Sequence, residues 1–416
     1  MFDLLSDILS SLGKNKLRTI LTGSSMAWGV FILIVLLGCG NGLKNAIMSN
    51  YGDSYVNYLA MWPGNSTIPF NGLEAGRRTV IDDAVLARID EHLEEVSLIC
   101  PTRNVWSTTK TYKTEYVNGG IMGITMDRFK LYPVKILQGR NLNEMDNTLK
   151  RKVILVHKKN AEILFKGGDC IGEYVNVGNV PYKVIGVFTS DDNDQNPDDY
   201  APLATLDQLY PSRYGYDSVT LGIEGVNTVK QSQDFEKRLR ETIGEMLQFD
   251  PEDKSTIWVW NSMESYMGTK SIFTGIQLFL WLIGLGTLIA GIVGISNIML
   301  VTVKERTKEF GIRKALGAKP RNIISLILCE SLIITASFGY LGLLAGMLVI
   351  GALAKMFPAP EPGAEMQMTA FMNPEIDMGI AIAAIVILII AALLAALVPA
   401  RKAIEVKPIE ALHYNE

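Results

Sequence analysis

The sequence lacks the patterns by which most enzymes are recognised. No run of the form G-x-x-x-x-G-K-[ST] occurs, so the chain has no glycine-rich loop of the kind that holds the phosphates of ATP. Its three histidines and four cysteines are scattered, without the spacing of metal ligands. No Ser/His/Asp, Cys/His or paired-carboxylate arrangement is recognisable either. These absences exclude ATP hydrolysis by a P-loop and argue against a catalytic role, and we expect no metal or other cofactor in this chain.

Charged residues are also scarce: they make up 20% of the 416 residues, whereas 48% are hydrophobic. The apolar residues are concentrated near the N-terminus and in the last third, and the middle is more polar. This distribution is typical of a membrane protein with a large soluble insert. The net charge of −4 says little about partners, because the two signs are segregated by region. We expect membrane lipids around the apolar runs and no nucleic acid.

Four apolar runs are long enough to cross a membrane as helices. We place them at residues 19–40, 271–303, 322–355 and 378–398. Lysine and arginine gather before the first run, between the second and third, and after the fourth, which predicts that these segments and both termini are cytoplasmic. The insert at 41–270 and the loop at 356–377 then lie outside. The expected fold class is an α-helical membrane protein with four transmembrane helices and a large α+β extracytoplasmic domain between spans one and two.

The two ends of the chain are predicted to lie on the cytoplasmic side. Residues 1–18 have apolar positions at helical spacing, which predicts an amphipathic helix on the membrane surface. A signal peptide is the alternative, because Leu36-Leu37-Gly38-Cys39 resembles a lipoprotein cleavage site. The long first region with two acids and the span-length apolar run favour an uncleaved first span. Pro399 is expected to end the fourth span, and the tail at 399–416 to finish with a short helix at Ile409–Leu412.

The insert mixes helical and strand patterns. The predicted elements are helices at Asp82–His92 and Asn227–Leu247, strands at Val153–Val156 and Ile257–Trp260, and a hairpin over Tyr174–Phe188 turning at Gly178-Asn179. Asn227 is the expected N-cap of the second helix. Cys100 and Cys170 are expected to be free and buried, since two distant cysteines are a weak sign of a disulfide. The acidic run Asp191–Asp199 lacks the glycine and the final acidic residue of a calcium loop, so we expect a solvated surface loop.

Small residues recur at four-residue spacing in the second and third spans. Gly286, Ala290 and Gly294 form one strip, and Gly342 and Gly346 a second, where another helix can approach closely. Glu330 is the one acid deep in a span. An intramembrane carboxylate is a functional candidate by default. Because it lies about two turns from Arg321, we favour a structural polar contact with a nearby Arg or Lys over a proton relay.

The loop at 304–321 is short and strongly charged. It carries seven basic residues against Glu305 and Glu309, and it also has helical features. Glu309 and Arg313 are four residues apart in the favourable order, and Gly317 is a natural stop. On composition alone this is an ordinary positive-inside loop; a docking helix for a cytoplasmic partner is the alternative.

A family resemblance favours the docking helix. Asn297-Ile298-Met299-Leu300-Val301-Thr302-Val303 followed by K-E-R-T-K-E-F-G-I-R-K-A-L-G-A resembles the MacB-type ABC transporter permeases, relatives of the lipoprotein-extracting Lol permeases and of FtsX. In that family this loop is a coupling helix that sits in a groove of the ATPase subunit. The resemblance implies that the ATPase contacts are Lys304, Glu305, Arg306, Lys308, Glu309, Gly311, Ile312, Arg313, Lys314 and Gly317.

The resemblance extends to the insert and to the tail. Gly139-Arg140-Asn141-Leu142 and Tyr182-Lys183-Val184-Ile185-Gly186-Val187 are similar to the MacB-type periplasmic core, and V-P-A-R-K-A-I-E-V-K-P-I-E-A-L-H-Y is similar to the family's C-terminus. By this likeness the insert has a lobe built from its two ends and a distal lobe at about 129–223. The first span is expected to continue as a stalk.

The resemblance also implies a function. Full MacB proteins carry an N-terminal ATPase domain, which this chain lacks, so we expect a separate ATPase subunit that holds ATP and Mg²⁺. A second permease protomer, in a homo- or heterodimer in the bacterial inner membrane, is a further expected partner. A periplasmic adaptor and an outer-membrane channel accompany some members. The expected function is mechanotransmission that drives export or efflux from the periplasm. The alternatives are an FtsX-like regulator of a cell-wall hydrolase and a Lol-type lipoprotein-extracting permease.

Overall fold

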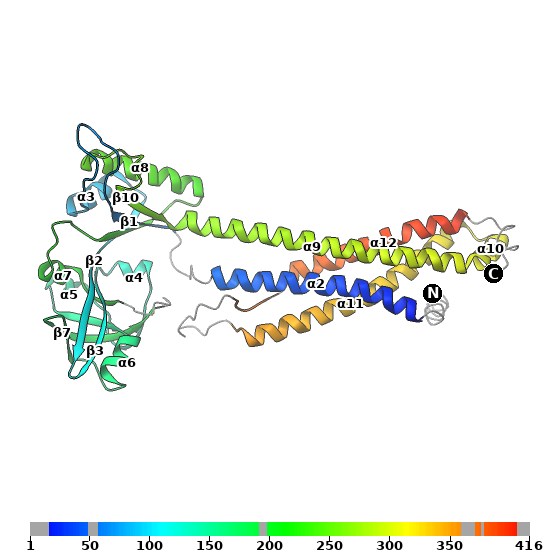
Figure 1. Cartoon of the computed structure of the whole chain (residues 1–416), viewed down its shortest axis with the longest axis horizontal. Helices are drawn as coiled ribbons and strands as arrows, with labels where there is room; N and C mark the ends of the chain where they lie inside the picture. The colour runs from blue at the N-terminus through cyan, green and yellow to red at the C-terminus, as the bar shows by residue number, and fades with distance from the viewer. Residues whose placement is uncertain (1–15, 49–56, 191–197, 359–370, 376–377, 406–416) are drawn as a thin grey trace. The chain divides into compact units, whose positions relative to one another are not determined.

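The computed structural model describes residues 16–48, 57–190, 198–358, 371–375 and 378–405. The chain divides into two compact units, a set of membrane-type helices and an α+β domain inserted after the first of them (Figure 1). Most of the amphipathic segment predicted at 1–18, and the final helix predicted at Ile409–Leu412, lie outside the described residues.

Four helices of the first unit are long and apolar enough to span a membrane, which confirms the four predicted spans. They are α2 (Lys16–Met48), α9 (Ser262–Glu305), α11 (Pro320–Met356) and α12 (Met378–Glu405). All four are longer than the predicted spans: α2 continues to Met48, α9 already begins at Ser262, and α12 runs to Glu405. With 44 residues, α9 is about 66 Å long. That is about twice the hydrocarbon thickness of a bilayer.

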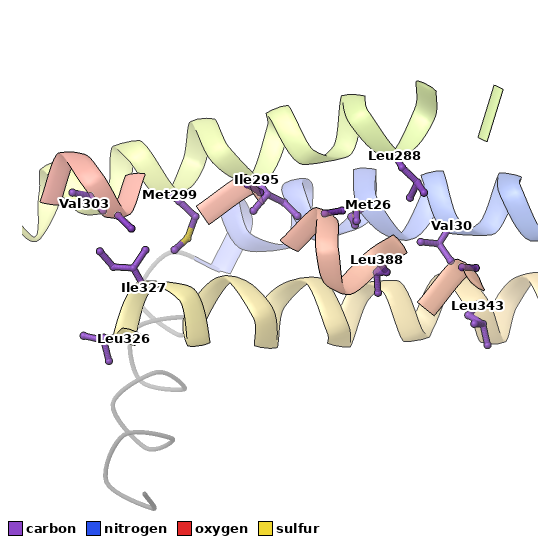
Figure 2. Packing of buried hydrophobic residues seen from close by; sticks show 14 of the residues in the cluster. Met26, Val30, Leu288, Ile295, Met299, Val303, Leu326, Ile327, Leu343 and Leu388 are labelled. Carbon is purple, nitrogen blue, oxygen red and sulfur yellow. The ribbon is translucent and has the colours of Figure 1, made fainter. Parts of the chain in front are cut away.

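The helices of this unit share one hydrophobic core. Figure 2 shows its labelled side chains: Met26 and Val30 from α2, Leu288, Ile295, Met299 and Val303 from α9, Leu326, Ile327 and Leu343 from α11, and Leu388 from α12. Each of these side chains is buried. Large apolar residues such as Leu282 and Leu348 are exposed on the outside of the same helices. Helices that are apolar all round are expected where lipid covers the outer face.

The expectation that Pro399 ends the fourth span is wrong, because α12 runs through it to Glu405. A proline removes one hydrogen bond to the carbonyl four residues back, which usually breaks a helix in water. Here Ala400 and Ala403 are buried in the shared core, so packing holds the turns that follow. Membrane helices in general tolerate proline, because neighbouring helices and local adjustments give the freed backbone groups other partners.

The α+β domain is built on one ten-stranded sheet with the order β10-β1-β9-β2-β3-β8-β5-β7-β4, and β6 pairs with β2 and β7. The strands are β1 (Tyr58–Pro63), β2 (Val96–Tyr112), β3 (Glu115–Ile124), β4 (Lys135–Gly139), β5 (Val153–His157), β6 (Tyr174–Val177), β7 (Val180–Thr189), β8 (Asp199–Pro202), β9 (Ser218–Ile223) and β10 (Ile257–Asn261). The helices are α3 (Asp83–His92), α4 (Arg128–Leu131), α5 (Glu144–Thr148), α6 (Lys158–Phe165), α7 (Leu203–Leu209) and α8 (Val229–Leu247).

The long strand β2 belongs to two hydrophobic cores. Its first half pairs with β9 and its second half with β3. One core packs α3 and α8 against β1, β9 and β10, and two further clusters lie around β3, β5 and β7. The division therefore differs from the distal lobe expected at 129–223. The strand β9 packs with the ends of the insert, whereas β3 packs with its middle.

Local predictions in the insert were mostly met. The hairpin of β6 and β7 pairs Val177 with Val180, and Gly178 takes a positive φ of 58° at its turn. Two predictions were wrong in detail. Thr228, rather than Asn227, caps α8, in a capping box with Gln231. Asp199 does not lie in a solvated loop: it begins β8 and is buried, with Lys110 Nζ 2.6 Å from its Oδ2. The rest of that run, 191–197, lies outside the described residues.

Candidate functional site

The helix α10 (Thr307–Ala315) follows α9 almost without a break (Figure 1). Arg306 N donates to Thr302 O at 3.0 Å, and Phe310 N donates to Arg306 O at 3.1 Å, so helical hydrogen bonds cross the junction. The Thr307 hydroxyl donates to the carbonyls of Val303 and Lys304 at 3.2 and 2.7 Å. Such back-bonding by threonine bends a helix. At Arg306, the residue between the two helices, φ is −97° and ψ is 14°, so α10 continues α9 after a one-residue departure from helical geometry.

The C-terminal end of α10 is closed by a glycine. Gly317 has a φ of 86°, a left-handed conformation that costs other residues strain. The N–H of Ala318 donates to Arg313 O at 3.0 Å, which satisfies a carbonyl of the last turn. Pro320 then opens α11 at a position where its missing N–H is harmless.

The inner face of α10 is tied to the helices around it by charge and packing. Phe310 is buried in the core of the helical unit. Arg306 lies at the centre of the polar contacts: its guanidinium donates to both carboxylate oxygens of Glu309, at 2.8 and 3.0 Å, and to Glu330 of α11 at 3.2 Å. Glu309 also pairs with Arg313 at 2.8 Å. Glu330, whose side chain is 4% exposed, thus contacts an arginine.

A third helix joins this face through Lys314. Its ammonium group donates to the backbone carbonyl of Ile404, in the last turn of α12. A cation there also interacts favourably with the negative end of the helix dipole. α10 is thereby linked to α9, α11 and α12 at once.

A row of exposed residues at four-residue spacing runs from the end of α9 along the outer face of α10 to its C-cap. Lys304, in the last turn of α9, and Lys308 of α10 are exposed, and Ile312 of α10 and its C-cap Leu316 follow them with exposed fractions of 43% and 83%. Residues four apart lie one above another on a helix, so these side chains form one stripe. We call the four of them the outer stripe. Two lysines followed by two large apolar side chains form a surface suited to another protein.

The predicted ATPase contacts are therefore split between two faces. Lys304, Glu305, Lys308, Ile312 and Gly317 are exposed, Arg306, Glu309, Arg313 and Lys314 are half-buried, and Gly311 is buried. Leu316 was absent from the predicted set, although its spacing from Lys308 and Ile312 carried the signal. A polar contact of Glu330 with an Arg or Lys was expected, but Arg306 was not named as the partner, because 24 residues separate the two.

The two predicted glycine strips differ in their surroundings. A Cβ at Gly342 would lie 2.2 Å from the Ala27 carbonyl oxygen of α2, and one at Gly346 would lie 2.7 Å from Ile34. Gly286 and Ala290 are exposed instead, and a Cβ at Gly286 would meet nothing within 4 Å in the described chain. A Cβ at Gly294 would meet Ser25, at 3.5 Å, and no other residue of the described ranges. Within the chain, α9 approaches α2 through Gly284 and Gly291.

Two family models match the chain. One, described as the MacB-like periplasmic core domain, matches residues 19–240, which is more than half of the chain. The chain belongs to the MacB-like family of ABC transporter permeases. The other model, the FtsX-like permease C-terminal region, matches residues 281–408 of this MacB-like permease and includes α10.

The chain is similar to proteins named as ABC transporter permeases or as MacB. An uncharacterized ABC transporter permease of Bacillus subtilis, YvrN, is 26% identical over 97% of this chain and 98% of its own length. The macrolide export ATP-binding/permease protein MacB of Escherichia coli K12 is 25% identical over 85% of this chain. The aligned region is 53% of that MacB, so the MacB-like permease spans about half of its length. The solved periplasmic region of MacB from Actinobacillus actinomycetemcomitans matches 54% of the chain with a TM-score of 0.43 and 19% identity.

Proposed function

We propose that this MacB-like permease couples ATP hydrolysis by a separate ATPase subunit to movement of its α+β domain, and that this movement drives export of a substrate outside the cytoplasm. The observation that carries the proposal is the two-faced α10. Its inner face is bound to three long helices, and its outer stripe is free of described neighbours large enough to bury Ile312 or Leu316.

The contacts of the inner face explain how a push on α10 would be transmitted. A helix attached only by its chain ends could move without its neighbours. The bonds from Arg306 to Glu330 and from Lys314 to Ile404 bind α10 to α11 and α12, and the helical hydrogen bonds bind it to α9. A tilt imposed on the outer stripe therefore moves the helices as a group. Since α9 is continuous to Ser262, the tilt extends along its whole length.

The spans themselves favour mechanical work over a polar channel. Within the described residues of the four apolar windows, Glu330 is the deep acid, and Arg306 pairs with it. Intramembrane ionisable groups mark the pathways that polar substrates follow through a membrane. Gly342 and Gly346 instead bring α11 into direct contact with α2. This arrangement fits mechanical movement of the α+β domain better than passage of a substrate between the helices.

The remaining parts of the proposal concern the membrane topology and the partner proteins. The positive-inside rule puts α10 and both termini in the cytoplasm and the α+β domain outside. A second protomer would complete the transporter, and an adaptor and an outer-membrane channel are further partners of the export route. The match of the insert to the MacB-like core model supports export over an FtsX-like regulator.

The test changes the two apolar residues of the outer stripe and leaves the inner face intact. Ile312→Asp with Leu316→Asp should abolish co-purification of the ATPase subunit, because two carboxylates would have to be desolvated in the contact. Leu149→Asp, which changes a leucine that is 56% exposed on the α+β domain, is the matched control. Equal recovery of the ATPase with the double variant and the control would refute the coupling role of α10.

A further inference from the structure

The strand β10 forms one edge of the ten-stranded sheet, and no described strand pairs with its outer side. A groove of about 440 Å³ runs along this edge. It lies between β10 and α8 and also reaches the first turn of α9. Among the residues that line it are Glu236, Arg240, Lys254, Val259 and Glu264. All of these belong to the α+β domain as contacts define it.

The hydrogen-bond pattern shows which backbone groups of β10 face the groove. Gly64 N donates to Thr256 O at 2.9 Å, and the register then pairs Pro63 with Ile257 and Met61 with Val259. In an antiparallel pair the hydrogen-bonded positions alternate. Ile257 and Val259 are therefore at positions that do not bond to β1, which agrees with the lack of an N–H on Pro63. Their N–H and C=O groups point toward the open edge.

A side chain of the domain already forms a hydrogen bond with one of these outward backbone groups. Arg240 of α8 donates from its guanidinium to the Ile257 carbonyl at 3.0 Å. Arg240 itself is held by Glu236 at 3.1 Å. This bond confirms that the Ile257 carbonyl faces away from β1. Because Arg240 occupies the Ile257 carbonyl, another strand would begin to pair with β10 at Val259.

Tryptophans border the same edge on the sheet face opposite α8. Trp258 and Trp260 alternate with the inward-facing Ile257 and Val259, and they are 63% and 49% exposed. Trp62 of β1 lies directly across from Trp258 and is 42% exposed. Exposed tryptophans gathered in this way are typical of surfaces that bind another molecule. An extended chain on β10 would have α8 on one side and these rings on the other.

We propose that this edge of the sheet binds an extended segment of a partner protein, which adds a strand antiparallel to β10. Antiparallel pairing gives straight hydrogen bonds to both the N–H and the C=O of Val259. The charges at the two ends of the groove set the preferred sequence. The guest's N-terminal end would lie beside Glu264 and its C-terminal end beside Lys254, and both of these residues are exposed. The fitting segment is basic at its start, acidic at its end, and alternates apolar and polar residues between.

The test measures peptide binding to the purified full chain and needs no ATPase. The probe is a fluorescein-labelled, end-blocked peptide, Lys-Thr-Val-Thr-Val-Thr-Glu, followed by fluorescence anisotropy. Val259→Pro removes the outward N–H of Val259, and proline is tolerated on an edge strand at such a position. Val259→Thr keeps that N–H and is the matched control. We expect Val259→Thr to bind within twofold of the unchanged chain, and Val259→Pro to bind at least tenfold more weakly with an unchanged near-ultraviolet circular dichroism spectrum.

Two further arms test the pairing and its direction. A peptide N-methylated on its central threonine cannot donate from that residue and should also bind at least tenfold more weakly. Lys254→Glu with Glu264→Lys should reverse the preference toward the peptide that starts with Glu and ends with Lys. Absence of saturable binding at millimolar peptide, or equal binding by Val259→Pro, would overturn the proposal. Dissociation of protomers by Val259→Pro without loss of peptide binding would assign the edge to a second copy of the chain, and would also overturn it.

Discussion

Three charged side chains, Arg306, Glu309 and Glu330, make the ion pairs that attach α10 to α11. Arg306 is shared between Glu309, on its own helix, and Glu330, on α11. Its guanidinium has donors in a fixed fork, so one residue can orient two carboxylates. Glu330 is a residue whose burial in a span would be costly without such a partner. We therefore interpret Glu330 as the anchor that fixes α10 to α11, rather than as part of a proton pathway.

This interpretation predicts an asymmetry between two single substitutions. Arg306→Gln leaves Glu330 in the span without the guanidinium, which should cost about 3–5 kcal/mol. Glu330→Gln leaves Arg306 paired with Glu309 and should cost clearly less. The double variant Arg306→Gln with Glu330→Gln should recover part of the loss. Thermal unfolding of the detergent-solubilised chain measures all three, and equal losses for the two single variants would contradict the assignment.

A second residue, Asp253, holds the loop that follows β1. Its carboxylate accepts from Thr67 N at 2.6 Å, from the Thr67 hydroxyl at 2.8 Å and from Ile68 N at 3.1 Å. Burial raises the pKa of Asp253, but these hydrogen bonds outweigh it and lower that pKa to about 2. A lowered pKa means that the stabilisation is complete above the unfolded value, about 3.9, and is lost as the pH falls toward 2.

The expected effect of Asp253→Asn therefore depends on pH. At pH 6 the variant should unfold more easily than the unchanged chain, by about 1–3 kcal/mol, because the hydrogen bonds lose a charged acceptor. Between pH 4 and pH 2 the difference should shrink toward zero. Unfolding of the α+β domain, followed by near-ultraviolet circular dichroism, gives both values. A difference that stays constant down to pH 2 would contradict the role of the Asp253 carboxylate.

At the scale of elements, the sequence predicted what depends on local spacing. The hairpin at Gly178 and the helix at Asp83–His92 follow from short-range turn and capping chemistry. The pairing of Glu309 with Arg313 follows from helical spacing. What depended on distant neighbours was not predictable. Pro399 stays helical because of buried alanines around it, and Asp199 is buried because Lys110 lies on a strand far away in sequence.

The glycines of the membrane helices give a test at this scale. Gly342→Ala places a methyl group against the backbone carbonyl of Ala27, 2.2 Å away, so α11 and α2 must separate. Gly286→Ala, on the exposed strip of α9, meets nothing within 4 Å among the described residues. We expect Gly342→Ala to lower thermal stability in detergent by about 1–3 kcal/mol. Gly286→Ala should not lower it, since alanine is the better helix former.

The same pair of variants separates packing within the chain from packing between chains. If the exposed strip of Gly286 and Ala290 contacts a second protomer, then Gly286→Ala should weaken the dimer without lowering the stability of the fold. Size-exclusion chromatography with light scattering measures the molar mass, and therefore shows whether the chain is a dimer. Equal stability losses for both variants would mean that the exposed strip of α9 is covered within the chain.

At the scale of the whole molecule, family membership and the number of spans were within reach of the sequence. The motifs between Asn297 and Arg321 are local and specific, and hydropathy reports the spans. The division of the insert was less accessible. The long strand β2 contributes to two cores. The strand β9 pairs with the first half of β2 and packs in the core of α3 and α8, although the strands of the other core lie between β2 and β9 in the sequence. Pairing between strands that are distant in the sequence cannot be predicted from the spacing of residues within each strand.

The central claim is that force applied at the outer stripe of α10 moves the far end of α9. It is tested by a spin-label distance measurement between the two protomers of the assembled transporter in lipid nanodiscs. Gly268→Cys, in a background lacking the four native cysteines, places the label on α9 at an exposed site where a Cβ meets no described atom within 4 Å. We predict that ATP with vanadate shifts the distance distribution, and that Lys308→Glu with Leu316→Ala reduces the shift in proportion to the lost coupling. An unchanged distribution while the bound ATPase hydrolyses ATP would contradict the account.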